Sequence, residues 1–386
     1  MNREAVIVAY GRSAVCKARK GALAGTHPVD YGAQVLKGIL AKLPQLPLDE
    51  IEDLIVGCAV PTDRASMNMA KLIAARAQLP QGVCGQTINR FCSSSLQAIA
   101  TAANAILAGQ GDIIIAGGVE DMTGTYGPCK PEWMDAWLAE HCPGAYMPMG
   151  LTAENVAAKF GITRAEMDAF AVESHAKAAK AQQEGKLAKS IIPITVSDPS
   201  GISITICKDE GIRADSTMES LAKLKPCFLP EGGKVTAATS SQTSDGAAFV
   251  VLMERSRAET LGIKPIARLR SFAVAGCDAT LMGLGPIYAV PKALKRAGIT
   301  AANLDDIELN EAFAAQAIPC IRELGLDPAK VNPYGGAIAL GHPMGATGAI
   351  LTCKLLDYLS EAEEKTGLVT MCIGGGMGAA GIFELL

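Results

Sequence analysis

The chain has 386 residues, more than one hydrophobic core usually organises, so we expect two or three domains. Apolar residues make up 49% and charged residues 19% of the sequence, which excludes a disordered chain and predicts a well-packed globular protein. With a formal net charge of -4, nothing in the composition favours nucleic acid or an anionic membrane surface as a partner.

The first part of the chain alternates apolar strand patterns with helical spacing. In order, we predict a strand at 4–12, a helix at 30–43, a strand at 51–60, helices at 68–77 and 93–107, and a strand at 112–120. This alternation predicts an α/β fold with a parallel sheet. No apolar run approaches the ~20 residues of a membrane helix, and the opening MNREAVIVAY resembles no signal peptide, so we expect a cytoplasmic protein.

Cys92 lies in the segment NRFCSSSLQA (residues 89–98), directly before one of these helices. Free amides and positive partial charge at a helix start stabilise a thiolate, so we expect the pKa of this thiol to fall. Cys92 is therefore a candidate nucleophile, and a small structural residue is the alternative. The twelve cysteines form no CxxC pair and the four histidines are widely separated, so we expect reduced thiols and no metal site.

Residues 122–242 interrupt this pattern and begin with a stretch rich in Pro, Gly and Met. Helical spacing at 152–160 and 164–184 indicates an inserted lid or substrate-binding domain. The strand and helix order then returns, with strands at 265–274, 304–313 and 367–378 and helices at 287–297 and 346–359. We therefore predict three units: 1–121 with about 243–262, the insertion 122–242, and 263–386. Shared βαβ patterning without duplication is the alternative.

His342 occupies, in the second half, the place that Cys92 occupies in the first. It lies in NPYGGAIALGHPMGATGA (residues 332–349), where glycine and alanine allow the backbone to approach a ligand closely. A histidine paired with a reactive cysteine is a candidate general base, and a core histidine is the alternative.

Two further segments carry candidate groups. Asn310 starts NEAF at a strand end, where polar residues often line a crevice, although a helix cap made by Asn310 and Glu311 fits equally. Near the C-terminus, CIGGGMGAAG (residues 372–381) combines a thiol with exposed backbone amides that can bind an oxyanion. Its GxGxxG at 376–381 is not a dinucleotide fingerprint, because only five residues follow Gly381.

Seven blocks in this order resemble the thiolase superfamily, and the match covers nearly the whole chain. The blocks are NRFCSSSLQA (89–98), GGVEDM (117–122), VTAATSSQTSDGAA (235–248), MGLGP (282–286), NEAF (310–313), GGAIALGHPMGATG (335–348) and CIGGGMG (372–378). The resemblance implies duplicated α/β halves in a five-layered αβαβα core with an inserted loop domain.

The resemblance also implies roles for individual residues. Cys92 would accept the acyl group, His342 would take its proton, and Cys372 would act as acid and base at the substrate α-carbon. One oxyanion would be held by His342 with a water fixed by Asn310, and the other by the amides of Cys92 and Gly374.

For the substrate, the resemblance implies that Ser241 contacts the pantetheine arm and Arg213 the nucleotide end of coenzyme A. Pro148 precedes Met149 where short-chain biosynthetic members carry histidine, which favours a degradative 3-ketoacyl-CoA thiolase over an acetoacetyl-CoA thiolase. Ser95 and Thr123 replace the usual glycine and serine.

The same resemblance implies a homodimer or homotetramer, a possible partner in a β-oxidation assembly, and no cofactor beyond coenzyme A as substrate. Ketoacyl synthases share the fold but do not need a second cysteine, so Cys372 argues against that class. A catalytically inactive scaffold is the other alternative, and the retention of all four candidate groups argues against it.

Overall fold

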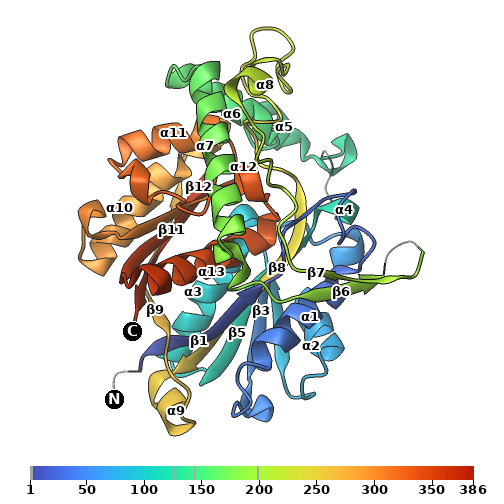
Figure 1. Ribbon diagram of the computed structural model, residues 1–386, viewed down its shortest axis with the longest axis vertical. Coiled ribbons are helices and arrows are strands. Elements are labelled where there is room, and N and C mark those ends of the chain that lie inside the picture. The colour runs from blue at the N-terminus through green and yellow to red at the C-terminus, as the bar shows by residue number, and fades with distance from the viewer. Residues whose placement is uncertain (1–2, 126, 128, 143, 198–199) are drawn as a thin grey trace.

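The computed structural model describes residues 3–125, 127, 129–142, 144–197 and 200–386 (Figure 1). Its N-terminal half contains five long strands and three main helices. The strands are β1 (Ala5–Arg12), β3 (Asp53–Gly57), β4 (Cys84–Ile88), β5 (Ile113–Asp121) and β8 (Ser244–Glu254), with the short β2 (Cys16–Lys17) beside β8. The helices are α1 (Pro28–Leu40), α2 (Met69–Arg76) and α3 (Ser94–Leu107), and the short α9 (Arg255–Thr260) follows β8.

The C-terminal half repeats this order with four strands. They are β9 (Ala267–Gly276), β10 (Asp306–Leu309), β11 (Thr366–Ile373) and β12 (Met377–Leu385). The helices are α10 (Gly285–Ala297), α11 (Ala314–Glu323), the single turn α12 (Ala337–Leu340) and α13 (Met344–Ala362). A parallel bridge between Ile307 and Val331 stands where the N-terminal half has its parallel β3–β4 pair.

The strands form one ten-stranded sheet in the order β10-β11-β12-β9-β1-β8-β5-β3-β4, with β2 off this path. The halves are joined through β1 and β9 by the single register pair Ile7–Ala267. One apolar cluster contains α3 and α13 together with strands of both halves, whereas α1 and α2 pack in a second cluster and α10 and α11 in a third. Two buried helices thus lie between the halves, with helices outside each, which gives five layers (Figure 1).

The sequence patterns predicted most of these elements but not the direction of all strands. In the described part of the chain, the β3–β4, β3–β5 and β10–β11 pairs are parallel and the other strand pairs antiparallel, so the sheet is mixed and the expectation of a wholly parallel sheet is wrong. In each half the chain returns antiparallel after the parallel strands, through β8 and β12. The predicted strand 367–378 is in fact β11 and the start of β12, because a glycine turn reverses the chain between them.

Between β5 and β8 of the N-terminal half, the chain forms an irregular segment over one face of the molecule. It contains α4 (Met122–Thr125), α5 (Ala136–His141), α6 (Met149–Lys159), α7 (Arg164–Gln183), α8 (Met218–Ala222) and a projecting hairpin of β6 (Ile194–Ser197) and β7 (Ser203–Ile206) (Figure 1). A capping box of Thr163 and Glu166 starts α7, whose length agrees with the predicted helix. Among the described residues, no helix has the length and apolar character needed to cross a membrane.

Candidate active site

Cys92 lies in a single 3₁₀ turn, Phe91–Ser93, directly before α3. Phe91 before it has φ of 44°, a left-handed conformation that favours glycine, so this turn is strained. Burial raises the pKa of the Cys92 thiol to about 11, although the backbone amides of Gly374 and Cys92 lower it. The expected fall in pKa is therefore wrong, because desolvation of the thiolate outweighs the helix-start amides.

His342 is buried just before α13, and its ring is held from both sides. Its Nδ1 lies 2.6 Å from Thr347 Oγ1, and Thr347 Oγ1 donates to the Pro343 carbonyl at 3.0 Å. Because the hydroxyl proton is engaged there, Nδ1 must carry the ring proton and Nε2 keeps its lone pair. Burial lowers the pKa of His342 to about 4, so the imidazole is neutral at pH 7 and can accept a proton at Nε2.

Asn310 follows β10 and is fully buried. Its Nδ2 lies 3.4 Å from His342 Nε2, while its Oδ1 has no hydrogen-bond partner among the described residues. The cap interpretation is wrong, because α11 begins only at Ala314 and its N-cap residue is Phe313. Asn310 instead points a buried amide at the candidate base.

Cys372 is fully buried near the end of β11. Burial raises the pKa of this thiol well above its ordinary value, and interaction with the Cys92 charge raises it further. The turn after Cys372 depends on glycine, since Gly375 and Gly376 have φ of 79° and 84°. The Cys92 turn packs against β11, so that the Gly374 amide bonds to the Cys92 sulfur and the Cys92 and Cys372 thiols interact.

The two helices that carry Cys92 and His342 at their starts pack against each other. Ser95 Oγ accepts from the Ala349 amide at 2.9 Å, which joins the first turn of α3 to the second turn of α13. The buried Glu120 carboxylate accepts from the amides of Gly345 at 2.6 Å and Ala59 at 2.8 Å. These contacts fix the N-terminal half against the His342 segment.

The inserted segment brings Met149 and Ser241 to the same region. A methyl group on Gly374 would lie 3.4 Å from Met149 Sδ, so Met149 borders the glycine turn. The Ser241 amide donates to the Ala312 carbonyl at 2.9 Å, next to Asn310, and the following Gln242 carbonyl accepts from the His342 amide at 2.9 Å. Both residues therefore lie on segments that border the candidate catalytic groups.

Arg213 lies farther out and is exposed. Its amide donates to His175 Nδ1 at 3.1 Å, and the Gly211 carbonyl accepts from Gln242 Nε2 at 2.9 Å. The loop of Arg213 is thus fixed to the loop of Ser241, and the Arg213 side chain is exposed at the surface.

Sequence reasoning missed two residues that contact this arrangement. Thr347 fixes the His342 ring, and its position in the first turn of the following helix was the available signal. Glu311 was interpreted as a charge at a helix start. Its carboxylate in fact accepts from the Ile338 amide of α12 at 3.2 Å and from Ser174 and Asn332.

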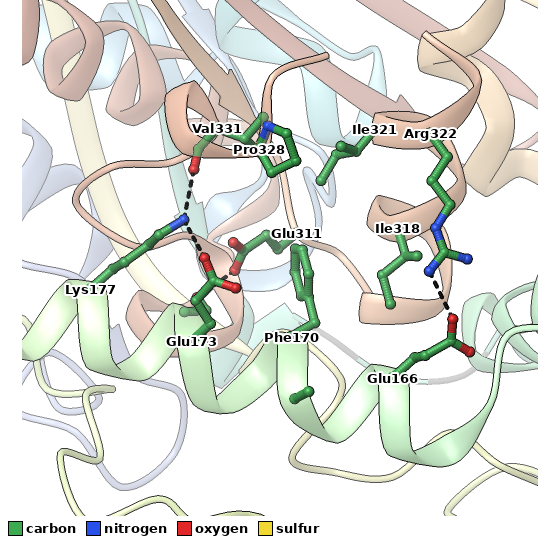
Figure 2. Close-up of a pocket in the computed structure, with 12 residues that line it drawn as sticks. Glu166, Phe170, Glu173, Lys177, Glu311, Ile318, Ile321, Arg322, Pro328 and Val331 are labelled. Carbon is green, nitrogen blue, oxygen red and sulfur yellow. Dashed lines mark hydrogen bonds and ion pairs between the residues drawn. The ribbon is translucent and has the colours of Figure 1, made fainter. Parts of the chain in front are cut away.

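A groove of about 320 Å³ lies elsewhere, between α7 and α11 (Figure 2). Its lining is largely apolar, with Phe170 and Ile318 among the labelled residues, and the Glu166–Arg322 ion pair closes one side. None of the candidate catalytic residues lines it, but Glu311 does.

Comparison with known proteins identifies the family. Residues 5–256 match the family described as "Thiolase, N-terminal domain", and residues 263–385 match "Thiolase, C-terminal domain". Proteins named 3-ketoacyl-CoA thiolase from Bacillus subtilis (strain 168) and Marinomonas sp. (strain MWYL1) are 49% and 45% identical to the chain. The alignments cover 99% of this chain and 100% and 98% of those proteins.

Solved structures give the same family. The crystal structure of the Bacillus anthracis acetyl-CoA acetyltransferase superposes with a TM-score of 0.92 and 37% sequence identity. The superposition covers 100% of both chains, so the arrangement of layers described above is shared along the whole length.

Proposed function

The chain belongs to the thiolase family and is an acyltransferase, and we propose that it cleaves 3-ketoacyl-CoA with a second coenzyme A. The products are acetyl-CoA and an acyl-CoA shortened by two carbons. The observation that carries this proposal is the meeting of two buried thiols, Cys92 and Cys372, with a glycine-turn amide directed at the first.

In the first half of the cycle, Cys92 attacks the 3-keto carbon and its proton passes to His342 Nε2. The carbon–carbon bond beside the carbonyl then breaks, and the departing acetyl-CoA enolate takes the proton of Cys372. His342 is suited to the first transfer because it is neutral with a free Nε2 lone pair. Cys372 is suited to the second because its raised pKa keeps it protonated at neutral pH.

The second half restores both groups. The incoming coenzyme A thiol gives its proton to the Cys372 thiolate left by the first half, and its sulfur attacks the acyl group on Cys92. Cys92 then leaves and recovers its proton from His342. Protons and acyl groups balance over the two halves, so coenzyme A takes part as substrate and the chemistry calls for no separate cofactor.

Two oxyanions form in this cycle, and the site has donors for each. The amides of Gly374 and Cys92 point at the Cys92 sulfur, where the tetrahedral intermediate forms. In the part of the chain that the structure describes, the buried Asn310 Oδ1 has no hydrogen-bond partner. Such an atom favours a water, which together with His342 would bind the thioester oxygen. Met149 and Ser241 would border the acyl and pantetheine groups, and the exposed Arg213 would meet the coenzyme A phosphates.

We also propose, from the family resemblance, a role in fatty-acid β-oxidation in the cytoplasm, and assembly as a homodimer or homotetramer. The division into units 1–121 with about 243–262, 122–242 and 263–386 is part of the same proposal. The alternative is condensation of two acetyl-CoA molecules by an acetyl-CoA C-acetyltransferase, the activity named for the Bacillus anthracis structure.

The test is the coenzyme A-dependent loss of 3-ketoacyl-CoA enolate absorbance, with acetoacetyl-CoA and 3-ketohexadecanoyl-CoA as substrates. Cys92→Ser should lower turnover at least ~10³-fold, as removal of a covalent nucleophile does. The exposed Cys129→Ser is the matched control and should turn over at the parent rate. Parent-like turnover by Cys92→Ser would refute the mechanism, and activity confined to acetoacetyl-CoA would favour the alternative.

A further inference from the structure

The contact between Asn310 and His342 joins two segments that are distant in sequence. Their side chains meet at 3.4 Å, although 32 residues separate them. Asn310 stands at the end of β10, and His342 follows α12 across Gly341. The end of β10 and α12 must therefore be held at a fixed spacing for the proposed oxyanion site to exist.

Glu311, the residue after Asn310, makes that connection. Its fully enclosed carboxylate accepts from Ser174 Oγ at 2.7 Å, Asn332 Nδ2 at 2.9 Å and the Ile338 amide at 3.2 Å. The Ile338 amide belongs to the first turn of α12, where backbone donors lack helical partners. One carboxylate thus joins β10 to α12, to α7 and to the segment before α12.

The same region is shaped around this carboxylate. A methyl group on Gly336 would come within 2.1 Å of Glu311 Cδ, so only glycine allows the approach. The Gly336 amide donates to Ser174 Oγ at 3.1 Å, which fixes the hydroxyl proton toward Glu311. Figure 2 shows Glu311 on the inner side of the groove, facing α7.

A neutral amide cannot replace this carboxylate. Asn332 Oδ1 accepts from the Leu309 amide at 2.9 Å and its Nδ2 donates to the Leu309 carbonyl at 2.8 Å, so the Asn332 amide cannot rotate. Three donors therefore converge on residue 311. A glutamine there would direct its own NH₂ group at one of them.

We propose that Glu311 is a positioning residue, which sets the Asn310–His342 contact by joining the end of β10 to α12 and α7. This inference rests on the proposed function for its kinetic consequence. It assigns no contact with substrate to Glu311. It predicts instead that loss of the carboxylate displaces His342 relative to Asn310 and slows chemistry more than binding.

The test compares Glu311→Gln with Asp168→Asn. Asp168 is a second buried carboxylate, which belongs to α7, pairs with Arg164 and lies outside the hydrogen-bond network of Glu311. In the thiolysis assay, Glu311→Gln should lower kcat about 10-fold to 100-fold. The KM values for 3-ketoacyl-CoA and for coenzyme A should stay within about twofold of the parent values. Asp168→Asn should lower the melting temperature about as much as Glu311→Gln does, but should not change kcat. Equal kcat in Glu311→Gln and the parent would overturn the proposal.

A second readout does not depend on turnover. In protein labelled with ¹⁵N-histidine, the His342 ring signals, assigned with His342→Asn, should move in Glu311→Gln and stay in place in Asp168→Asn. Unmoved His342 signals in Glu311→Gln would overturn the proposal, whether or not the parent is active. A parent that cleaves neither substrate would refute only the proposed function. If Glu311→Gln fails to fold, Ser174→Ala can be used in its place, because it removes one of the three donors to Glu311. The same shift of the His342 signals is expected, and its absence would overturn the inference.

Discussion

At the scale of single residues, the two proposed acid–base partners are both neutral before substrate binds. Burial raises the pKa of Cys92 to about 11 and lowers that of His342 to about 4, so a thiol and an imidazole face the substrate. In the proposed mechanism, charge appears only as the tetrahedral intermediate forms, on its oxyanion and on the His342 imidazolium. In that proposal, the amides of Gly374 and Cys92 would stabilise the oxyanion at that moment, which is where such stabilisation accelerates a reaction.

Thr347 should matter for turnover because it fixes the proton of His342 on Nδ1. Thr347→Val removes the acceptor, so the ring can rotate or change tautomer, and we expect kcat to fall about 10-fold to 100-fold. Thr352→Val is the matched control, since Thr352 is a buried threonine of the same helix whose hydroxyl donates to the Gly348 carbonyl at 2.8 Å. The proposal for Thr347 fails if both variants, assayed by thiolysis, keep the parent kcat.

The identities of the candidate residues could be predicted from sequence, but their electrostatic state could not. Motifs indicated Cys92, His342, Asn310 and Cys372, and the structure places these residues in buried positions around the two helix starts. The pKa of Cys92 depends on how much of the chain covers it, and local sequence does not report that. The role of Glu311 was missed for a similar reason, because its three hydrogen-bond donors come from segments far apart in sequence.

At the scale of elements, the main helices and several strands could be predicted because their apolar residues form a clear pattern. α3 and α7 lie within a residue or two of the expected ranges. β4 was missed because its sequence, CGQTI, is mostly polar or small and only half-covered. β8 and β12 are buried throughout or nearly so, so their sequences show no alternation that would reveal an antiparallel return.

Strand β10 carries an excess of buried acid, which predicts how stability depends on pH. Glu308 pairs with Lys354 at 2.7 Å, while both Asp306 oxygens lack partners among the described residues. Burial, and then the Glu308 charge, raise the pKa of Asp306 well above its ordinary value. A carboxyl whose pKa is raised by folding contributes stability below its ordinary pKa and loses it as pH rises through the raised value.

Asp306→Asn should therefore stabilise the fold at alkaline pH, because the amide cannot ionise. We expect a melting temperature about 1–3 °C above the parent at pH 8, with the difference closing toward pH 4. Asp305→Asn is the control, since Asp305 Oδ2 accepts from the Lys365 and Thr366 amides and gains nothing from neutralisation. A variant less stable than the parent at pH 8, measured by calorimetry, would contradict this account of Asp306.

At the scale of the whole molecule, the outer edges of the sheet differ between the two halves. On β10, the outer edge is covered, because the Asn332 amide donates to the Ile307 carbonyl and its side chain pairs with Leu309. On β4, the Cys84 amide and the Ile88 carbonyl make their hydrogen bonds on the side that faces β3. Among the described residues no strand covers the far side of β4, and Met67, Phe91 and Leu72 lie exposed near it. Open edges of this kind normally find a partner.

We therefore predict that two copies pair through β4 around a two-fold axis, so that the sheets of both become continuous. Light scattering should give the parent a mass of about 80 kDa, twice 40.0 kDa, or a multiple of it. Cys84→Asp with Gln86→Asp places like charges on the same strand of both copies and should yield a 40.0 kDa monomer. Leu229→Asp, at an exposed leucine of the inserted segment, should leave the mass unchanged. A monomeric parent would refute the predicted pairing, and a double variant with the parent mass would place the interface elsewhere.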